Sequence, residues 1–316
     1  MTIVQLQYVL AVHKYKNFTA AAENCFVTQP TLSMQIQKLE DELNVEIFDR
    51  STHPIKPTKI GLQIIEQAKF IVNESKKIKS IIQEEKGTLE GEFTLGIIPT
   101  VFPNLIPLFL KTYLKKYPLI KLIIKELPTN EILKQIREGV IDIGIVATPL
   151  EEDGMIEVPL YYEPFVAFIP ENHKLMQKSI LTNKDLENSD LLLLEEGHCF
   201  RDSILNICDI KENEIDKKVV FESGNLNALI NLARDGFGMT LLPLLHAEEI
   251  EKTEKNRLRY FFDPVPTREI SLIFHKSMLR MNFVNSLKDT IQSIIRGKLS
   301  LESKNTVISP RIQLKK

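Results

Sequence analysis

Apolar side chains recur at three- and four-residue spacing through the first sixty positions, which is typical of short amphipathic helices. The third predicted helix begins near Thr28, which can act as its N-cap, with Pro30 tolerated in the first turn. Two adjacent helices, the second with a polar outer face, are typical of a helix-turn-helix. Residues 46–57, with two prolines and basic side chains, predict a hairpin or wing. The predicted core-facing residues are Leu6, Val9, Leu10 and His13; Phe18, Ala21, Ala22 and Cys25; and Leu32, Ile36, Leu39 and Leu43.

One long helical pattern follows, from Thr58 to about Lys86, and Gly87 ends it. About 27 helical residues would extend roughly 40 Å at about 1.5 Å per residue. Its apolar residues alternate by four and three, close to a heptad seam, and such a seam packs against a partner helix. The seam residues are Ile64, Ala68, Ile71, Ser75, Ile78 and Ile82.

Beyond Gly91 the pattern changes to alternating strands and helices. The strand-like segments FTLGIIPT, IKLIIKEL and IDIGIVAT are separated by helical patterns at 104–116 and 130–138, which predicts a βαβαβ run with a parallel sheet. The overall prediction is a multidomain α+β protein. The last twenty residues show no clear period, and we expect them to be mobile. Further strands are predicted at 157–169, 191–195, 219–222, 239–243 and 269–275, and further helices at 225–235 and 277–296.

Composition narrows the class of protein. The chain has 316 residues, 43% hydrophobic and 26% charged, which excludes disorder over the whole length. Lys and Arg number 40 against 42 Asp and Glu, so a histone-like basic coat is excluded, although a local nucleic-acid site is not. No apolar run is long enough to span a membrane, and the N-terminus lacks the pattern of a signal peptide. Three cysteines argue against a secreted disulfide framework, so the predicted compartment is the cytoplasm.

The outer face of helix 29–43 carries side chains that can contact DNA bases. Ser33 and Gln37 can donate and accept hydrogen bonds, and Pro30 and Met34 can contact thymine methyl groups. Residues 1–60 hold six basic and six acidic side chains, so non-specific attraction to DNA is expected to be weak. A three-helix packing module with a solvated face is the alternative interpretation. The predicted phosphate-binding residues are Arg50, Lys56 and Lys59.

A cysteine pair is the clearest candidate for chemistry. Cys199 lies between His198 and Arg201, and Asp202 is placed to cap a helix that runs to Cys208. A cysteine just before a helix N-terminus and near a guanidinium has its thiolate favoured, and the thiolate attacks peroxides. If the intervening segment is helical, the two Cα atoms lie about 10 Å or more apart. A disulfide needs about 4.4–6.8 Å, so its formation would unwind the helix. The alternative is a pair of structural cysteines, the role also expected for Cys25 in the core.

The segment FTAAAENCFVTQPTLSMQIQKLEDELNVEIFDRS resembles the helix-turn-helix signature of LysR-type transcriptional regulators, and the resemblance extends to about residue 297. It implies a winged helix-turn-helix over 1–60, a dimerising linker helix over 61–87 and a two-lobed effector domain over 88–297. That domain resembles periplasmic binding proteins, and a mobile tail over 298–316 follows. GIIPTVFPNLIP and EEGHCFRDSILNIC narrow the match to members of the family that sense hydrogen peroxide.

The resemblance also implies roles for individual residues and partners. Thr100 and Thr129 would line a peroxide pocket beside His198, which Arg268 would approach, and Gln29 would lie at the start of the recognition helix near DNA. The implied partners are promoter DNA, further copies of the chain as a dimer and then a tetramer, and RNA polymerase, with no membrane. No cofactor or metal site is predicted, and the protein is not expected to be an enzyme. A regulator that binds a small metabolite between the lobes and a thiol peroxidase are the alternatives.

Overall fold

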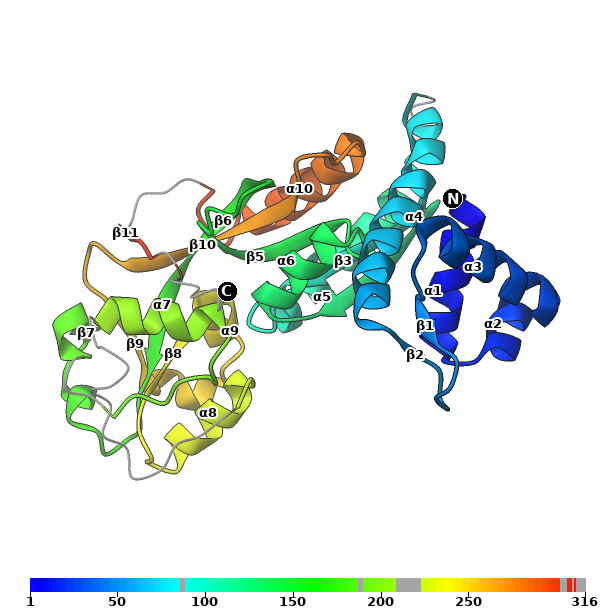
Figure 1. Ribbon diagram of the computed structural model, residues 1–316. Coiled ribbons are helices and arrows are strands. Elements are labelled where there is room, and N and C mark those ends of the chain that lie inside the picture. The colour runs from blue at the N-terminus through cyan, green and yellow to red at the C-terminus, as the bar shows by residue number, and fades with distance from the viewer. Residues whose placement is uncertain (86–88, 187–189, 209–222, 302–305, 309, 311–316) are drawn as a thin grey trace. The chain divides into compact units, whose positions relative to one another are not determined.

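The computed structural model describes all residues except 86–88, 187–189, 209–222, 302–305, 309 and 311–316 (Figure 1). The chain forms two compact units. One contains Met1–Thr88 with Lys134–Val140, and the other contains Leu89–Leu133 with Ile141–Lys316. The predicted strand at 219–222 lies outside the described residues.

Three helices and a small hairpin form the N-terminal domain. The helices begin at local caps: the Thr2 side chain accepts a hydrogen bond from the Gln5 backbone, and Thr28 accepts one from the Thr31 backbone, with proline in the first turn as predicted. Leu43, predicted to face the core, is 38% exposed, because it lies in the last turn of its helix. The elements are α1 (Ile3–Tyr15), α2 (Phe18–Asn24), α3 (Gln29–Leu43), β1 (Phe48–Asp49), β2 (Lys56–Pro57) and α4 (Lys59–Glu85).

Helix α4 has the predicted length of 27 residues, but its apolar residues serve two purposes. Ile65, Ala68 and Val72 are buried in the same hydrophobic core as α1, α2 and α3. The assignment of Ala68 to a partner-facing seam is therefore wrong. Ile71 and Ile78 are 37% and 61% exposed, and they remain available for a partner helix.

Nine strands of the described chain form one continuous sheet in the effector domain. Strands β3, β4 and β5 pair in parallel and form the first lobe, as the βαβαβ pattern predicted. The long strands β6 and β10 pair antiparallel with each other. Strand β10 also pairs with β5, whereas β6 also pairs with β8 and β9. These two long strands therefore run through both lobes (Figure 1). The strands are β3 (Gly91–Ile97), β4 (Ile120–Glu126), β5 (Ile143–Thr148), β6 (Met155–Phe168), β7 (Ile180–Leu181), β8 (Thr240–Pro243), β9 (Leu258–Phe261), β10 (Pro266–His275) and β11 (Thr306–Val307).

Helices and short 3-10 turns cover the sheet. In the second lobe, α7, α8 and α9 share a core with β6, β8 and β9 that includes Phe165, Phe168 and Phe200. The helices are α5 (Phe102–Lys116), α6 (Thr129–Arg137), α7 (Cys199–Cys208), α8 (Leu226–Arg234), α9 (Leu244–Glu248) and α10 (Met281–Ile295), and the 3-10 turns are η1 (Lys174–Gln177), η2 (Asn183–Asp185) and η4 (Lys252–Arg257).

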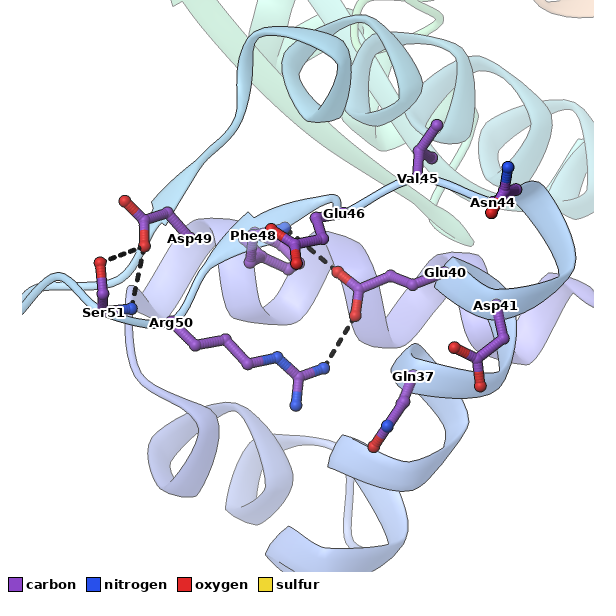
Figure 2. Close-up of a pocket in the computed structure, with 10 residues that line it drawn as sticks. All are labelled: Gln37, Glu40, Asp41, Asn44, Val45, Glu46, Phe48, Asp49, Arg50 and Ser51. Carbon is purple, nitrogen blue, oxygen red and sulfur yellow. Dashed lines mark hydrogen bonds and ion pairs between the residues drawn. The ribbon is translucent and has the colours of Figure 1, made fainter.

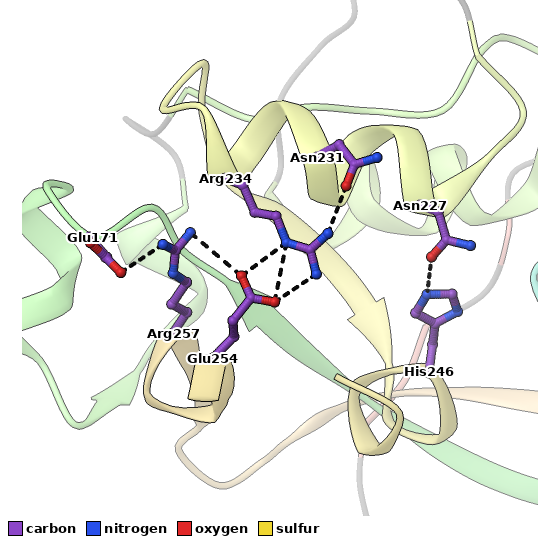
Figure 3. Close-up of polar contacts among 7 residues, drawn as sticks. All are labelled: Glu171, Asn227, Asn231, Arg234, His246, Glu254 and Arg257. Atoms are coloured by element: carbon purple, nitrogen blue, oxygen red, sulfur yellow. Dashed lines mark hydrogen bonds and ion pairs between the residues drawn. The ribbon is translucent and has the colours of Figure 1, made fainter. Parts of the chain in front are cut away.

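Ion pairs join the η4 turn to the end of α8 and to the segment after β6 (Figure 3). Arg234 Nη2 lies 2.6 Å from Glu254 Oε2, and Arg257 Nη2 lies 2.7 Å from Glu171 Oε1. The Arg234 guanidinium holds the pKa of Glu254 below its usual value, mainly through a side-chain hydrogen bond. This carboxylate therefore contributes to the stability of the second lobe while it is ionised.

Three predictions for the effector domain are wrong in detail. Residues 191–195 form no strand; Leu191 makes a single bridge to Met239. Helix α10 begins four residues later than predicted, after Arg280. Part of the tail expected to be mobile is ordered: β11 pairs in parallel with β10, and the Tyr162 backbone donates to Ser300 O at 2.9 Å. The bridge at Leu191 and the pairing of the tail join distant segments, which local periodicity does not encode.

Candidate functional site

The outward face of α3 presents the side chains predicted to read DNA. Gln29, Pro30, Met34 and Gln37 are exposed and Ser33 is partly exposed. Their spacing along the helix follows from the burial of Leu32, Ile36 and Leu39 on the other side. Lys56 and Lys59, predicted to contact phosphates, are also exposed.

Arg50 has a structural partner inside the same domain (Figure 2). Its Nη2 donates to Glu40 Oε2 at 2.8 Å, while Glu40 Oε1 accepts from the backbone N–H groups of Ile47 and Phe48 at 2.8 and 3.2 Å. Glu40 thereby ties the wing to α3. The groove beside this pair also carries Asp41, Glu46 and Asp49, and carboxylates repel phosphate. A phosphate contact by Arg50 stays a prediction.

In the effector domain, three segments meet around a narrow pocket, in which the space between atoms is about 180 Å³ including the part open to solvent. Thr100 comes from the turn after β3, Thr129 begins α6, and His198 and Cys199 lie at the start of α7. The first two segments belong to the first lobe and the third to the second lobe. The cavity is lined by Ile98, Pro99, Thr100, Pro128, Thr129, His198, Cys199 and Phe200.

The Cys199 thiol is less acidic than the sequence suggested. It is 4% exposed, and burial raises its pKa. The Thr129 hydroxyl, the Arg268 guanidinium and the Ala147 backbone act in the opposite direction, whereas the Asp202 carboxylate raises the pKa further. The prediction of a thiolate favoured at rest is therefore wrong, because burial outweighs the groups that favour charge.

Thr129 is the pocket residue with an unsatisfied polar atom. Its Oγ1 is buried, and no described atom lies in good hydrogen-bonding geometry to it. The hydroxyl is nevertheless close enough to Cys199 to favour the thiolate. A buried hydroxyl without a partner costs free energy. The atom is therefore suited to bind a small polar ligand in the cavity.

His198 is held by residues that the sequence analysis did not identify. Its Nε2 lies 3.5 Å from Glu195 Oε1, close enough for an ion pair when the imidazole is protonated. A Cβ atom on Gly224 would lie 2.8 Å from His198 Nε2 and 3.0 Å from Glu195 Oε1. A larger residue at Gly224 would force the imidazole or the carboxylate to shift, and the isolated position of this glycine in the sequence gave no signal.

Arg201 and Asp202 differ from their predicted roles. Helix α7 begins at Cys199, so Asp202 lies inside the first turn and is not the N-cap. Arg201 Nη1 donates to Leu194 O at 3.0 Å. The guanidinium whose charge acts on Cys199 is that of Arg268.

Arg268 is brought to the pocket from a distant strand. It is 2% exposed, and its Nη1 donates to Thr100 Oγ1 at 2.9 Å. The same guanidinium forms an ion pair with Glu163 at 2.8 Å. Sequence reasoning missed Glu163, because only the register between β6 and β10 places the two side chains opposite each other.

Cys208 lies at the far end of α7 from Cys199. Both thiols are buried and reduced, and the helix that joins them is ten residues long. At about 1.5 Å and about 100° per residue, their Cα atoms are about 13.5 Å apart and their side chains leave opposite sides of the helix. A disulfide is therefore incompatible with α7 as it stands. Cys25, predicted to be buried, is only half-buried at the edge of the N-terminal core.

Comparison with known families decides which protein class this is. A family described as "Bacterial regulatory helix-turn-helix protein, lysR family" matches residues 3–62, and one described as "LysR substrate binding domain" matches residues 86–294. The chain belongs to the LysR family of regulators. The predicted fold class and the DNA-binding character of this LysR-type regulator are thereby confirmed.

Curated relatives of this LysR-type regulator match over nearly its whole length. A "Hydrogen peroxide-inducible genes activator" of Pectobacterium carotovorum is 33% identical over 96% of this chain and 100% of its own. The "DNA-binding transcriptional dual regulator OxyR" of Escherichia coli is 32% identical over 94% of this chain and 97% of its own.

Solved structures agree with the sequence relatives. A full-length OxyR variant from Pseudomonas aeruginosa has a TM-score of 0.74 and 32% identity, covering 92% of this chain and 98% of that chain. A hydrogen-peroxide-bound OxyR mutant from Corynebacterium glutamicum has a TM-score of 0.63 and 29% identity, covering 94% and 93%.

The described residues contain neither a metal site nor a membrane-spanning helix. No group of three or more His, Cys, Asp or Glu side chains within them could hold a metal ion. Across the same residues, no helix of this LysR-type regulator is both long and apolar enough to cross a membrane.

Proposed function

We propose that this LysR-type regulator senses hydrogen peroxide through Cys199 and Cys208 and controls oxidative-stress genes accordingly. The observation that carries the proposal is a buried thiol at a small, hydroxyl-lined cavity, joined by a ten-residue helix to a second buried thiol. The names of the similar regulators, and the peroxide bound to one of them, support the same signal.

The pocket residues suit peroxide by their polarity. The hydroxyl groups of Thr100 and Thr129 can donate to one peroxide oxygen and accept from its O–H. With the side chains as they stand, the pocket has no room for a water-sized molecule, so it must open slightly to admit peroxide. A larger metabolite would require a larger rearrangement of the same side chains. The proposed peroxide pocket consists of Thr100, Thr129, His198, Arg201, Asp202 and Arg268.

The first step oxidises Cys199. Its sulfur attacks one peroxide oxygen as the thiolate, the O–O bond breaks, and hydroxide leaves and takes up a proton to form water. The product is a sulfenic acid at Cys199. Arg268 stabilises the thiolate needed for this step, which the resting pocket disfavours by burial.

The second step joins the two cysteines. The Cys208 sulfur attacks the sulfenic sulfur, the S–O bond breaks, and a second water leaves with the thiol proton. Two thiols are oxidised and one peroxide is reduced to two waters. Because α7 holds the cysteines about 13.5 Å apart, the bond requires α7 to unwind, which makes the disulfide a conformational switch.

In the proposed domain arrangement, residues 1–60 bind duplex DNA with α3 in the major groove, 61–87 form the dimerising linker, and 88–297 sense the signal. Ser33→Ala should then weaken discrimination among DNA sequences, whereas Lys56→Ala should weaken binding to all sequences alike and flatten its salt dependence. Equal losses on specific and random DNA from both variants would contradict this placement of α3.

Further partners follow from the same proposal. The protein would act in the cytoplasm as a dimer or tetramer bound to a partly palindromic DNA site. RNA polymerase would respond to the redox state of the bound regulator. A thiol peroxidase is the alternative from another class, since Cys199 chemistry would serve it equally. Multiple-turnover consumption of peroxide with a thiol reductant separates the enzyme from the sensor.

The direct test is thiol alkylation and mass spectrometry before and after dilute peroxide. We expect a linked Cys199–Cys208 peptide in the parent, a persistent sulfenic acid in Cys208→Ser, and no response in Cys199→Ser. Cys25→Ser is the matched control and should behave like the parent. If Cys199→Ser still forms an oxidised thiol as fast as the parent, Cys199 is not the sensing residue.

A further inference from the structure

A buried ion pair lies directly behind the Cys199 pocket. Arg268 on β10 and Glu163 on β6 are register partners across the sheet, and their side chains are 2% and 1% exposed. Arg268 Nε and Nη2 both donate to Glu163 Oε2, at 3.0 and 2.8 Å. A buried ion pair contributes little net stability relative to apolar residues of the same volume. Stability alone therefore does not explain this arrangement.

Glu163 is fixed through both of its carboxylate oxygens. Oε2 accepts the two donors of Arg268, and Oε1 accepts from the Leu245 backbone N–H at 2.9 Å, where α9 begins. The carboxylate cannot rotate without losing one of these contacts. It therefore fixes the position of the guanidinium as well.

The rest of the guanidinium faces the pocket. Arg268 Nη1 donates to Thr100 Oγ1 at 2.9 Å, and Nη2 also donates to Thr100 O at 3.2 Å. The guanidinium carbon lies 5.3 Å from the ring centroid of Phe200, the residue after Cys199. Since Thr100 Oγ1 accepts from Arg268, its own hydrogen is free to donate to a ligand. Glu163 thus orients one wall of the pocket through Arg268.

Charged and polar groups act on Cys199 from four elements. Burial raises the pKa of the thiol most; the Thr129 hydroxyl and the Arg268 guanidinium lower it, the Asp202 carboxylate raises it, and the Ala147 backbone lowers it. The guanidinium is thus the positive charge that favours the thiolate. How strongly the guanidinium favours the thiolate depends on how completely a nearby negative charge compensates its positive charge.

The charged and polar groups around Arg268 determine how far its positive charge is compensated. Glu163 lies at hydrogen-bond distance and opposes the positive charge directly. Burial raises the pKa of the Tyr161 hydroxyl and lowers the pKa of the His246 imidazole, and the charge of Arg268 acts on both groups in the direction of a lower pKa. Neither of these groups carries a negative charge near neutral pH. Glu163 is therefore well placed to control how strongly Arg268 acts on the sulfur.

We propose that Glu163 is a positioning residue for the reaction at Cys199. It holds Arg268 against the pocket and compensates its charge, so that the thiol stays unreactive until peroxide binds. This inference rests on the proposed function, because the oxidation of Cys199 is the reaction that Glu163 controls.

The test is the pH dependence of Cys199 alkylation by iodoacetamide in the full-length reduced protein, followed on the Cys199 peptide by mass spectrometry. Glu163→Gln keeps the shape of the side chain and removes its charge. We expect the midpoint of the alkylation profile to move to lower pH by about one unit, which makes alkylation below the midpoint about tenfold faster. A pair with only a structural role would lower the melting temperature and leave the midpoint in place.

Glu269→Gln is the matched control, because Glu269 follows Arg268 on β10 but accepts from Thr148 Oγ1 instead. Its midpoint should equal that of the parent. Glu163→Asp restores the charge on a shorter side chain, so its midpoint should stay near that of the parent while oxidation of Cys199 by peroxide slows several-fold.

An unchanged midpoint, or a higher one, in folded Glu163→Gln overturns the inference. Should that variant fail to fold, Glu163→Asp decides, and a peroxide rate equal to the parent's overturns it. Failure of the proposed function can be distinguished from failure of this inference. If the parent's Cys199 resists peroxide while Glu163→Gln still moves the alkylation midpoint, peroxide sensing is wrong and control of the thiol by Glu163 stands.

Discussion

Weakening the packing of α7 should make the sensor disulfide more stable relative to the thiols. Ile204 is 0% exposed in the core of the second lobe, near the middle of α7. If oxidation pulls α7 out of that core, the side chain contributes to the reduced state and not to the oxidised state. Ile204→Ala costs about 2–5 kcal/mol of reduced-state stability. At about 30 mV per 1.4 kcal/mol for a two-electron couple, the reduction potential should fall by about 40–110 mV.

The assay is a titration in glutathione buffers, with the fraction of Cys199–Cys208 disulfide measured by mass spectrometry. Ile204→Val should give a smaller shift of about 10–30 mV, since it costs about 0.5–1.5 kcal/mol. Leu241→Ala is the control: Leu241 is equally buried in the same core but lies on β8, outside the helix. It should lower the melting temperature and leave the potential unchanged. If Ile204→Ala lowers the melting temperature but not the potential, α7 keeps its packing in the disulfide form, and the unwinding mechanism is wrong.

Three further predictions concern stability and assembly. Glu254→Gln should lower the melting temperature at pH 7. Because Arg234 depresses the native pKa of Glu254, the difference from the parent should begin to shrink near pH 4.3 and vanish as the pH falls through the native pKa. A difference in melting temperature that persists at low pH would contradict the ion pair. Phe26→Gly should raise the melting temperature, since Phe26 is 95% exposed at a φ of 56° that favours glycine, and a lower one would show that the side chain packs. Replacing Ile71 and Ile78 with Asp should lower the mass measured by sedimentation of the full-length chain, because charges in a buried apolar contact are costly; an unchanged mass would mean that these residues face no partner.

Short-range features of this protein could be predicted from its sequence. The third helix was placed by Thr28 and Pro30, which act on the backbone of their own turn. The length of α4 and the order of β3, α5, β4, α6 and β5 followed from apolar periodicity within each segment. These elements are determined locally because capping and amphipathic spacing involve residues within one or two turns.

Side-chain environments required the tertiary structure. Ala68 could not be assigned to a partner or to the core, because α4 carries more than one apolar stripe and only the packing of α1 against it decides. The pKa of Cys199 was predicted with the wrong sign, since adjacent residues suggested a favoured thiolate and burial by segments distant in sequence raised the pKa instead. Burial depends on the whole chain, so no neighbouring residue signals it.

The cysteine pair combines a feature that the sequence determines with one that the tertiary structure determines. Its spacing, and hence the conflict between a helix and a disulfide, was already present in the sequence. The family resemblance had already implied that Arg268 approaches the pocket, but its action on the thiol could not be predicted from spacing, because Arg268 reaches the pocket through its register with Glu163, 105 positions earlier in the chain. Register between distant strands is fixed by the packing of the whole sheet, and the electrostatics of the site therefore belong to the tertiary structure.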